Sequence, residues 1–214
     1  DDGRIEFIGR FTKSISDSDG YSFATSKPID GPDYNRIQTY YAAIPIQKSL
    51  NTWWNTKFNL NLSYDDFKSI DSTLQTSNIL NRTYTADLQN NLNFNKYLSA
   101  VAGMEYQILN GTNVESGFHK NIYQTGYFLQ VSANYKDRAL LTSGFRHDVN
   151  SRYENKTTYK IEGSYRLTQT ETTFRASTST GFRGPTLNDL FFPGFSNPDL
   201  KPEESENWEI GITQ

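Results

Sequence analysis

The sequence of 214 residues has no cysteine, one methionine and two histidines. The lack of cysteine excludes disulfide scaffolds and cysteine-ligated zinc sites. A net charge of −3 leaves no basic stripe of the kind that binds nucleic acid. No run of about 18 apolar residues occurs, so no transmembrane helix is predicted. The N-terminal stretch DDGRIEFIGRFT does not have the pattern of a signal peptide, so we expect either export before this chain begins or a fragment.

Motifs for catalysis are also missing from the sequence. His119 and His147 are far apart in the chain, and there is no glycine-rich phosphate loop, nucleophile elbow or zinc-ligand spacing. His147, within FRHD, is expected at the rim of a strand rather than as a general base. We therefore do not expect an enzyme.

Aromatic residues are abundant, at 14% of the chain, and this argues against disorder. The hydrophobic fraction is only 35%, but apolar residues occupy alternate positions. In WNTKFNLNLSYDD, residues 54–66, the apolar side chains share one parity and the polar side chains share the other. This period of two predicts a strand with one apolar and one polar face. About ten such strands are predicted, near 4–15, 35–48, 52–66, 80–95, 97–109, 122–136, 138–148, 157–168, 170–181 and 205–214.

The predicted strands favour an antiparallel up-and-down transmembrane β-barrel. Many are longer than the usual globular strand and long enough to cross a bilayer when tilted. Their connections alternate between short and long, as in membrane barrels. Aromatic residues near the strand ends suit two membrane interfaces: Trp53, Trp54, Phe94, Tyr97 and Tyr135 on the short-turn side, and Tyr64, Tyr84, Tyr123 and Tyr159 on the other. A soluble β-sandwich or solenoid is the alternative.

The barrel prediction assigns a direction to each side chain. The lipid-facing set is Phe58, Leu60, Leu62, Leu88, Leu92, Leu129 and Val131. The lumen-facing set is Asn59, Asn61, Gln89, Asn91 and Gln130.

A long break in the alternation lies near residues 182–204, where prolines and glycines interrupt the pattern and residues 187–191 can form one short amphipathic turn. TGFRGPTLNDLF (residues 180–191), NPDLKPE (197–203) and SENWEIG (205–211) resemble linked motifs of TonB-dependent outer-membrane receptors. Gly184 departs from the alanine of the family pattern. Within the family the chain is most similar to the cobalamin (vitamin B12) receptors.

The resemblance implies an energised receptor in the bacterial outer membrane that imports a scarce metal-bearing ligand, cobalamin or a ferric siderophore. It implies outer-membrane lipid as a partner, and the TonB system acting through a plug domain. No plug pattern occurs in this chain, and family barrels have 22 strands, so residues 1–214 are expected to be one segment of the barrel. A passive outer-membrane pore and a soluble β-rich binding module are the alternatives.

Candidate site residues follow from the same resemblance. The long connections would be outer loops, which makes Tyr21, Asp189, Phe191, Phe192 and Phe195 candidate ligand contacts. The alternative for residues 182–204 is a structural role, in which the segment closes the end of the fold and contacts no ligand.

The cobalamin receptors bind calcium through outer-loop aspartates. Asp17, Asp19, Asp30 and Asp33 lie in the first long loop and are candidate calcium ligands, since clustered carboxylates suit a hard cation. A solvated acidic loop is the alternative.

The two end strands raise a further expectation. Ten strands are too few for the family barrel, and a ten-stranded closure would leave a lumen too narrow for a cobalamin-sized ligand. Free N–H and C=O groups along residues 4–15 and 205–214 would need partners in a membrane. We therefore expect both edges to be paired, by each other, by a second copy or by another chain.

Overall fold

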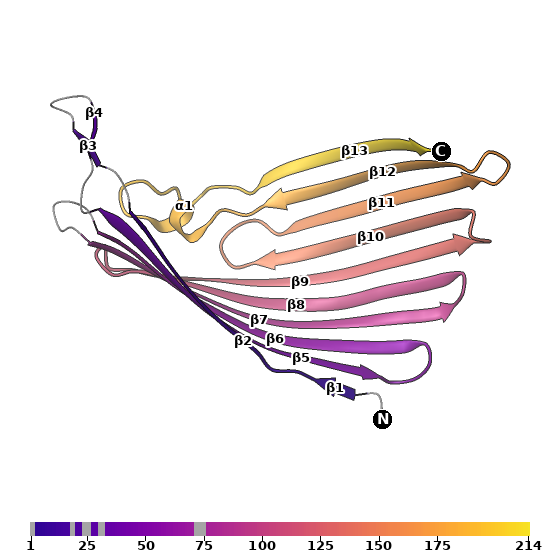
Figure 1. Ribbon diagram of the computed structural model, residues 1–214, viewed down its shortest axis with the longest axis horizontal. Helices are drawn as coiled ribbons and strands as arrows, with labels where there is room; N and C mark the ends of the chain where they lie inside the picture. Colours follow the sequence, from indigo (N-terminus) through magenta and orange to yellow (C-terminus); the bar gives the residue numbers. More distant parts are fainter. Residues whose placement is uncertain (1–2, 18–19, 23–26, 30–32, 71–75) are drawn as a thin grey trace.

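The computed structural model describes residues 3–17, 20–22, 27–29, 33–70 and 76–214, with only the backbone described at 20–22, 27–29 and 76. Ten long strand positions form one curved antiparallel sheet in chain order (Figure 1). The strands are β1 (Gly3–Ile5), β2 (Ile8–Asp17), β5 (Tyr34–Ser49), β6 (Trp54–Ile70), β7 (Thr76–Asn95), β8 (Leu98–Asn113), β9 (Phe118–Tyr135), β10 (Ala139–Asn150), β11 (Lys156–Leu167), β12 (Thr172–Arg183) and β13 (Glu203–Thr213). β1 and β2 follow one another along the same edge of β5, so they occupy one strand position.

The meander confirms the predicted fold class. Every neighbouring pair in the main sheet is antiparallel, and consecutive strands from β5 to β13 are hydrogen-bonded in order. Within the described residues, no helix has the length and hydropathy needed to cross a membrane. A second sheet contains only β3 (Gly20–Ser22) and β4 (Lys27–Ile29), a small hairpin that the sequence pattern did not predict.

Short turns gather at one end of the sheet and longer connections at the other (Figure 1). The short turns are closed by side chains that mimic backbone acceptors. Asn51 Oδ1 accepts hydrogen bonds from the N–H groups of Trp53 and Trp54, at 3.0 and 2.9 Å. In the β9–β10 turn, Lys136 and Asp137 both have positive φ, which matches the twist of a tight hairpin.

Several strands are longer than the alternation predicts. The expected loop over residues 110–121 is largely strand, because β8 extends to Asn113 and β9 begins at Phe118. Residues 114–117 form the turn, in which Asn113 Oδ1 accepts from Ser116 N at 3.0 Å and Gly117 has a φ of 65°. β8 continues to Asn113 because its backbone still pairs with β7 there. The residues of this extension are polar, so no alternation of apolar and polar side chains identifies them as strand.

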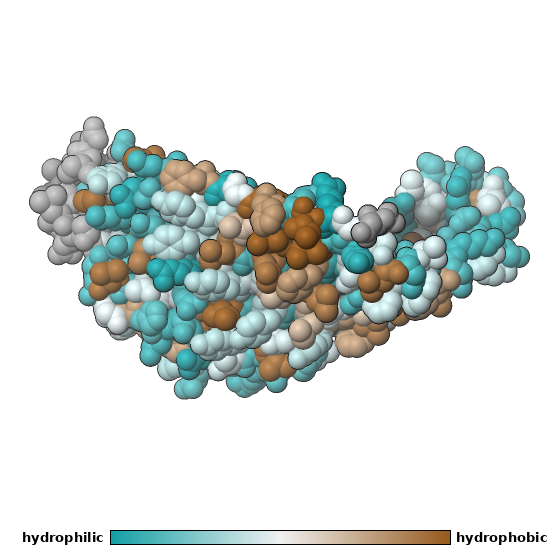
Figure 2. All heavy atoms as spheres, turned by 90° about the horizontal axis from the view of Figure 1, so that it is seen from below, coloured by the Kyte–Doolittle hydropathy of each residue, from teal (hydrophilic) through white to brown (hydrophobic). Residues whose placement is uncertain are grey.

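The two faces of the sheet differ as predicted. Leu60, Leu62 and Leu129 are exposed on one face. The amide of Asn59 donates to Asp87 and the hydroxyl of Tyr41 donates to Asn61, both at 3.0 Å, on the other face. Seen from the side of β2 and β5, hydrophobic residues are most concentrated near the middle of the molecule, and its ends are mainly hydrophilic (Figure 2). This is the distribution expected of a barrel wall in a membrane.

Aromatic residues mark both ends of the apolar face. At the short-turn end the rings of Trp53 and Phe94 are 5.9 Å apart, and Tyr97 and Tyr135 are exposed. Toward the other end the rings of Tyr40 and Tyr64 are 5.9 Å apart. Side chains that are apolar with a polar tip favour the membrane interface.

The sheet does not close on itself. Among the described residues, β1 and β2 pair only with β5, and β13 pairs only with β12. The prediction that both edges are paired is therefore wrong for the chain alone. The sheet is curved too gently for its ten strands to close into a barrel. Barrel diameter grows with strand number, so this curvature corresponds to a barrel of more than ten strands. Pairing of these edges in a membrane stays a prediction.

Candidate functional site: a polar wall and a segment at the mouth

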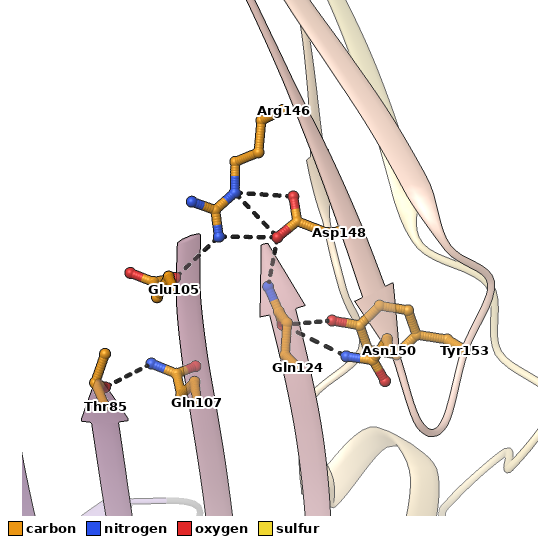
Figure 3. Close-up of polar contacts among 8 residues, drawn as sticks. All are labelled: Thr85, Glu105, Gln107, Gln124, Arg146, Asp148, Asn150 and Tyr153. Carbon is orange, nitrogen blue, oxygen red and sulfur yellow. Dashed lines mark hydrogen bonds and ion pairs between the residues drawn. The ribbon is translucent and has the colours of Figure 1, made fainter. Parts of the chain in front are cut away.

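The polar face carries a network of side chains that joins β8, β9 and β10 (Figure 3). Arg146 Nη2 lies 2.9 Å from Glu105 Oε1, and Arg146 Nε donates to Asp148 Oδ2 at 2.9 Å. Gln124 Nε2 donates to Asp148 Oδ1 at 3.1 Å. Asp148 is only 2% exposed, so its charge is stabilised by these donors rather than by water.

The network continues from the strands into the loop between β10 and β11. Tyr153 Oη donates to Gln124 Oε1 at 3.2 Å, and Asn150 Nδ2 donates to the same oxygen at 3.4 Å. Burial, together with the Asp148 carboxylate, raises the pKa of the Tyr153 phenol. The phenol therefore stays protonated and remains a donor at neutral pH. We call Glu105, Gln124, Arg146, Asp148 and Tyr153 the polar wall.

Residues 184–202, which we call the mouth segment, connect β12 to β13 and contain the helix α1 (Leu187–Phe191). The helix begins with a capping box. Asp189 N donates to Thr186 Oγ1 at 3.2 Å, and Thr186 N donates to Asp189 Oδ2 at 2.8 Å. These bonds satisfy backbone donors that the first helical turn leaves free. They explain why five residues next to a proline form a helical turn.

The mouth segment packs onto the same face as the polar wall. Leu190 is 1% exposed, and Phe118 and Ile122 of β9 are buried beneath the segment's apolar side. The rings of Phe118 and Phe191 are 6.4 Å apart. Gly111 of β8 leaves room for Leu187, because a Cβ there would be 2.7 Å from Leu187 Cδ1. α1 therefore lies inside the curve of the sheet, at the end with the longer connections (Figure 1).

Two cations lie over the ring of Phe191. Lys120 Nζ is 5.6 Å and Arg152 Cζ is 5.3 Å from the ring centroid. Arg152 Nε also donates to the carbonyl of Asn121 at 3.2 Å, which ties the β10–β11 loop to β9. The mouth thus combines an aromatic ring with positive charge.

The candidate ligand contacts do not all have the same surroundings. Asp189 is used as a helix cap, and the bonds from Thr186 lower the pKa of its carboxyl group. Phe191 contacts Phe118 of β9. Phe192 and Phe195 have ring centroids 6.5 Å apart, and Phe195 is 90% exposed. Tyr21 lies in β3, whose hairpin is at the same end of the molecule as α1 (Figure 1), but its side chain is outside the described residues.

A pocket of about 320 Å³ opens between the mouth segment and the wall. Its lining includes Leu109, Ile122, Gln124, Tyr153 and Pro185. The pocket is therefore apolar toward β8 and β9 and polar toward the network.

The candidate calcium ligands are only partly described. Asp17 ends β2 opposite Tyr34, the first residue of β5, and Asp33 directly precedes Tyr34, so Asp33 lies just before the strand that pairs with β2. Asp33 Oδ1 is buried and has no hydrogen-bond partner among the described residues. Asp19 and Asp30 lie outside the described residues. In the described part of the chain, no group of three or more acidic, histidine or cysteine side chains could hold a metal ion.

The sequence pattern did not single out the polar wall. Arg146 and Asp148 have the polar parity in GFRHDVN, and this alternation was the available signal. His147, the residue between them, has the opposite parity, and its Nδ1 lies 2.7 Å from Thr157 Oγ1 near the outer end of β10. Its position at a rim stays a prediction.

A curved sheet with an apolar outer face, a polar inner face and a segment folded into its mouth is the wall of an outer-membrane barrel. The sequence model of the family described as TonB-dependent receptor-like, β-barrel, matches residues 3–213. This chain therefore belongs to that family and to the bacterial outer membrane. The chain is 28% identical over 160 residues to the vitamin B12 transporter BtuB of Photobacterium profundum. The aligned region covers 74% of this chain and 26% of that protein. The chain thus corresponds to about a quarter of that relative's length.

Solved structures show the same fold at lower identity. The siderophore receptor PirA of Pseudomonas aeruginosa matches with a TM-score of 0.77 and 16% identity, over 99% of this chain and 40% of that one. The ferric enterobactin receptor PfeA of the same organism matches with a TM-score of 0.81 and 15% identity, over 98% of this chain and 38% of that one. The family and the fold predicted from the sequence are confirmed.

Proposed function

We propose that this chain forms part of the barrel wall and mouth of an energised outer-membrane receptor that imports a scarce metal-bearing ligand, cobalamin or a ferric siderophore. Energy would come from the TonB system through a plug domain. The observation that carries the proposal is the mouth segment: it is anchored on the inner face by Leu190, and it exposes Phe195, with the half-buried ring of Phe192 beside it.

The chemistry of the mouth supports a large organic cargo that has both apolar and polar or anionic groups. Exposed aromatic rings contact flat, partly apolar ligands at little entropic cost, since only two torsions are fixed. Lys120 and Arg152, over Phe191, supply positive charge for polar or anionic groups. The family relationship and the similarity to a vitamin B12 transporter favour cobalamin as the first cargo to test.

Cargo uptake by the full-length protein tests the proposal. The protein is expressed in a Gram-negative strain that lacks its own cobalamin receptor, and uptake of radiolabelled cyanocobalamin is measured with and without TonB. We expect uptake that needs both the protein and TonB. A ferric catecholate siderophore is the parallel probe. Uptake of either probe that is independent of TonB would indicate a passive pore, and absence of uptake of both would contradict the proposal.

The double variant Phe192→Ala/Phe195→Ala tests the mouth. We expect a loss of uptake with normal amounts of protein in the membrane, because Phe195 is 90% exposed and the ring of Phe192 contacts that of Phe195. Phe94→Ala is the matched control: it removes an exposed phenylalanine at the short-turn end, 49% exposed, and should leave uptake unchanged.

Calcium at the first outer loop is proposed as an accessory to this site. The described residues that support it are Asp17, at the end of β2, and Asp33, directly before β5, whose buried Oδ1 has no hydrogen-bond partner among the described residues. The test is calcium binding to the full-length protein by isothermal titration, with and without Asp19→Ala. Binding that is absent, or that the substitution does not change, would contradict this role for Asp19.

A further inference from the structure

The β10–β11 loop, residues 151–155, touches both ends of the mouth segment. At the start of the segment, the Tyr153 ring lies directly against Gly184. At its end, Glu154 Oε1 lies 3.2 Å from Lys201 Nζ. The ion pair is exposed and contributes little by itself. The packing of Tyr153 on Gly184 is therefore the contact that can fix the segment's position.

Gly184 is required here for space and not for backbone freedom. Its φ is not among the positive values in the described residues. A Cβ on Gly184 would lie 2.5 Å from Tyr153 Cζ and 2.9 Å from Cε1, and it would overlap Oη as well. An alanine at position 184 would therefore need a smaller or displaced side chain at position 153.

The Tyr153 ring cannot simply move aside. Its hydroxyl donates to Gln124, and the Gln124 amide is oriented by the buried Asp148 carboxylate. Asp148 is in turn held by Arg146. A shift of the ring would break a hydrogen bond in a half-buried network, where an unsatisfied group is costly.

We propose that Tyr153 and Gly184 form a matched pair that fixes the mouth segment against the polar wall, which makes Tyr153 a positioning residue for the aromatic contacts at the mouth. The pair links the network on β8, β9 and β10 to the segment that carries Phe192 and Phe195. The role in cargo binding rests on the proposed function, whereas the positioning of the segment does not.

Distance measurements on the full-length protein test the positioning. This chain has no cysteine, so spin labels at Ser116→Cys and Pro198→Cys report the separation between the β8–β9 turn and the mouth segment. We expect one narrow distance distribution in the parent. Gly184→Ala should abolish it, because the new methyl group and the ring cannot occupy the same space. Tyr153→Leu in the Gly184→Ala background should restore it.

Two further variants separate packing from hydrogen bonding and from general damage. Tyr153→Phe keeps the ring but loses the hydroxyl that holds it to Gln124, so it should leave the parent distribution narrow. In the Gly184→Ala background it should restore the distribution less than Tyr153→Leu does, because the ring carbons still lie 2.5 and 2.9 Å from the new methyl group. Gly163→Ala is the control: its Cβ would meet nothing closer than 3.9 Å, and the distribution should not change. If Gly184→Ala prevents folding, Tyr153→Leu alone is measured, and we expect the gap beside Gly184 to broaden the distribution.

A narrow distribution in both Gly184→Ala and Tyr153→Leu would overturn the proposal, and so would a failure of Tyr153→Leu to restore the distribution in the Gly184→Ala background. Uptake of cyanocobalamin is measured on the same variants. If the distances respond as expected and no variant takes up cobalamin, then the positioning role holds and the cargo assignment fails. If cobalamin is taken up equally by all variants, then positioning does not serve cargo contact.

Discussion

Arg146 on β10 reaches Glu105 on β8 across the strand between them, with 2.9 Å between Nη2 and Oε1. The path is open because the position on β9 is Gly126, which is paired with Glu105 on one side and Asp148 on the other. A Cβ on Gly126 would lie 2.5 Å from Arg146 Cζ and 2.8 Å from Asp148 Oδ1. One guanidinium group thus bridges β8 and β10 above the glycine of β9.

Gly126→Ala is therefore expected to lower the stability of the barrel. The added methyl group must displace Arg146 or Asp148, and overpacking of this kind costs about 1–3 kcal/mol. The measurement is urea unfolding of the full-length protein in detergent, followed by tryptophan fluorescence. Gly163→Ala, at an open position, is the control and should unfold like the parent. Equal stability of all three proteins would contradict the role given to Gly126.

The strands were predictable because each carries its own signal. Alternation within WNTKFNLNLSYDD identifies β6 without reference to any other part of the chain, and the same holds for β9. The turn at residues 187–191 was predictable from a local pattern and is helical as expected. The extension of β8 to Asn113 was not predictable, since it depends on backbone pairing with β7 and not on side-chain pattern.

The polar wall was less accessible to sequence reasoning. Arg146 and Asp148 are two residues apart, and their parity places both on the polar face. Glu105 is 41 residues away from Arg146, and only the register of three strands brings the two together. Tyr153 lies in a loop with no periodicity, and its contact with Gly184 requires knowing where the mouth segment folds.

Asn90 interrupts the apolar row of β7, and the structure shows its partner. The indole Nε1 of Trp54 donates to Asn90 Oδ1 at 2.9 Å. Trp54→Phe should leave the amide unpaired and cost about 1 kcal/mol, the usual size of such a bond. Asn90→Leu should leave the indole unpaired, whereas Trp54→Phe/Asn90→Leu removes both polar groups and should be more stable than the sum of the single effects predicts. Unfolding in urea gives the comparison, and additive effects would show that the pair is not coupled.

Acid should loosen the mouth segment through Asp189. Hydrogen bonds from Thr186 lower the pKa of Asp189 in the folded protein, so the cap stabilises the segment above the unfolded pKa of about 4 and loses that contribution as pH falls through the folded value. Spin labels at Ser116→Cys and Pro198→Cys should therefore report broader distances in the acid range below about pH 4. Asp189→Asn keeps the shape but not the charge, and should remove this pH dependence. A response that is the same in Asp189→Asn would assign the acid effect to another group.

The alternation of faces can be read along β6 with single spin labels. Leu60 and Leu62 are exposed on the apolar face, whereas Asn59 and Asn61 hydrogen-bond on the polar face. Labels at residues 58–62 in the full-length protein, reconstituted in lipid vesicles, should alternate with a period of two. Even-numbered positions should be accessible to oxygen, which concentrates in the bilayer, and odd-numbered positions should be shielded from it. The physical reason is that one face of each strand contacts lipid and the other faces the interior of the barrel. Oxygen accessibility that varies without this period, or that is highest at the odd-numbered positions, would show that the apolar face of β6 does not contact lipid.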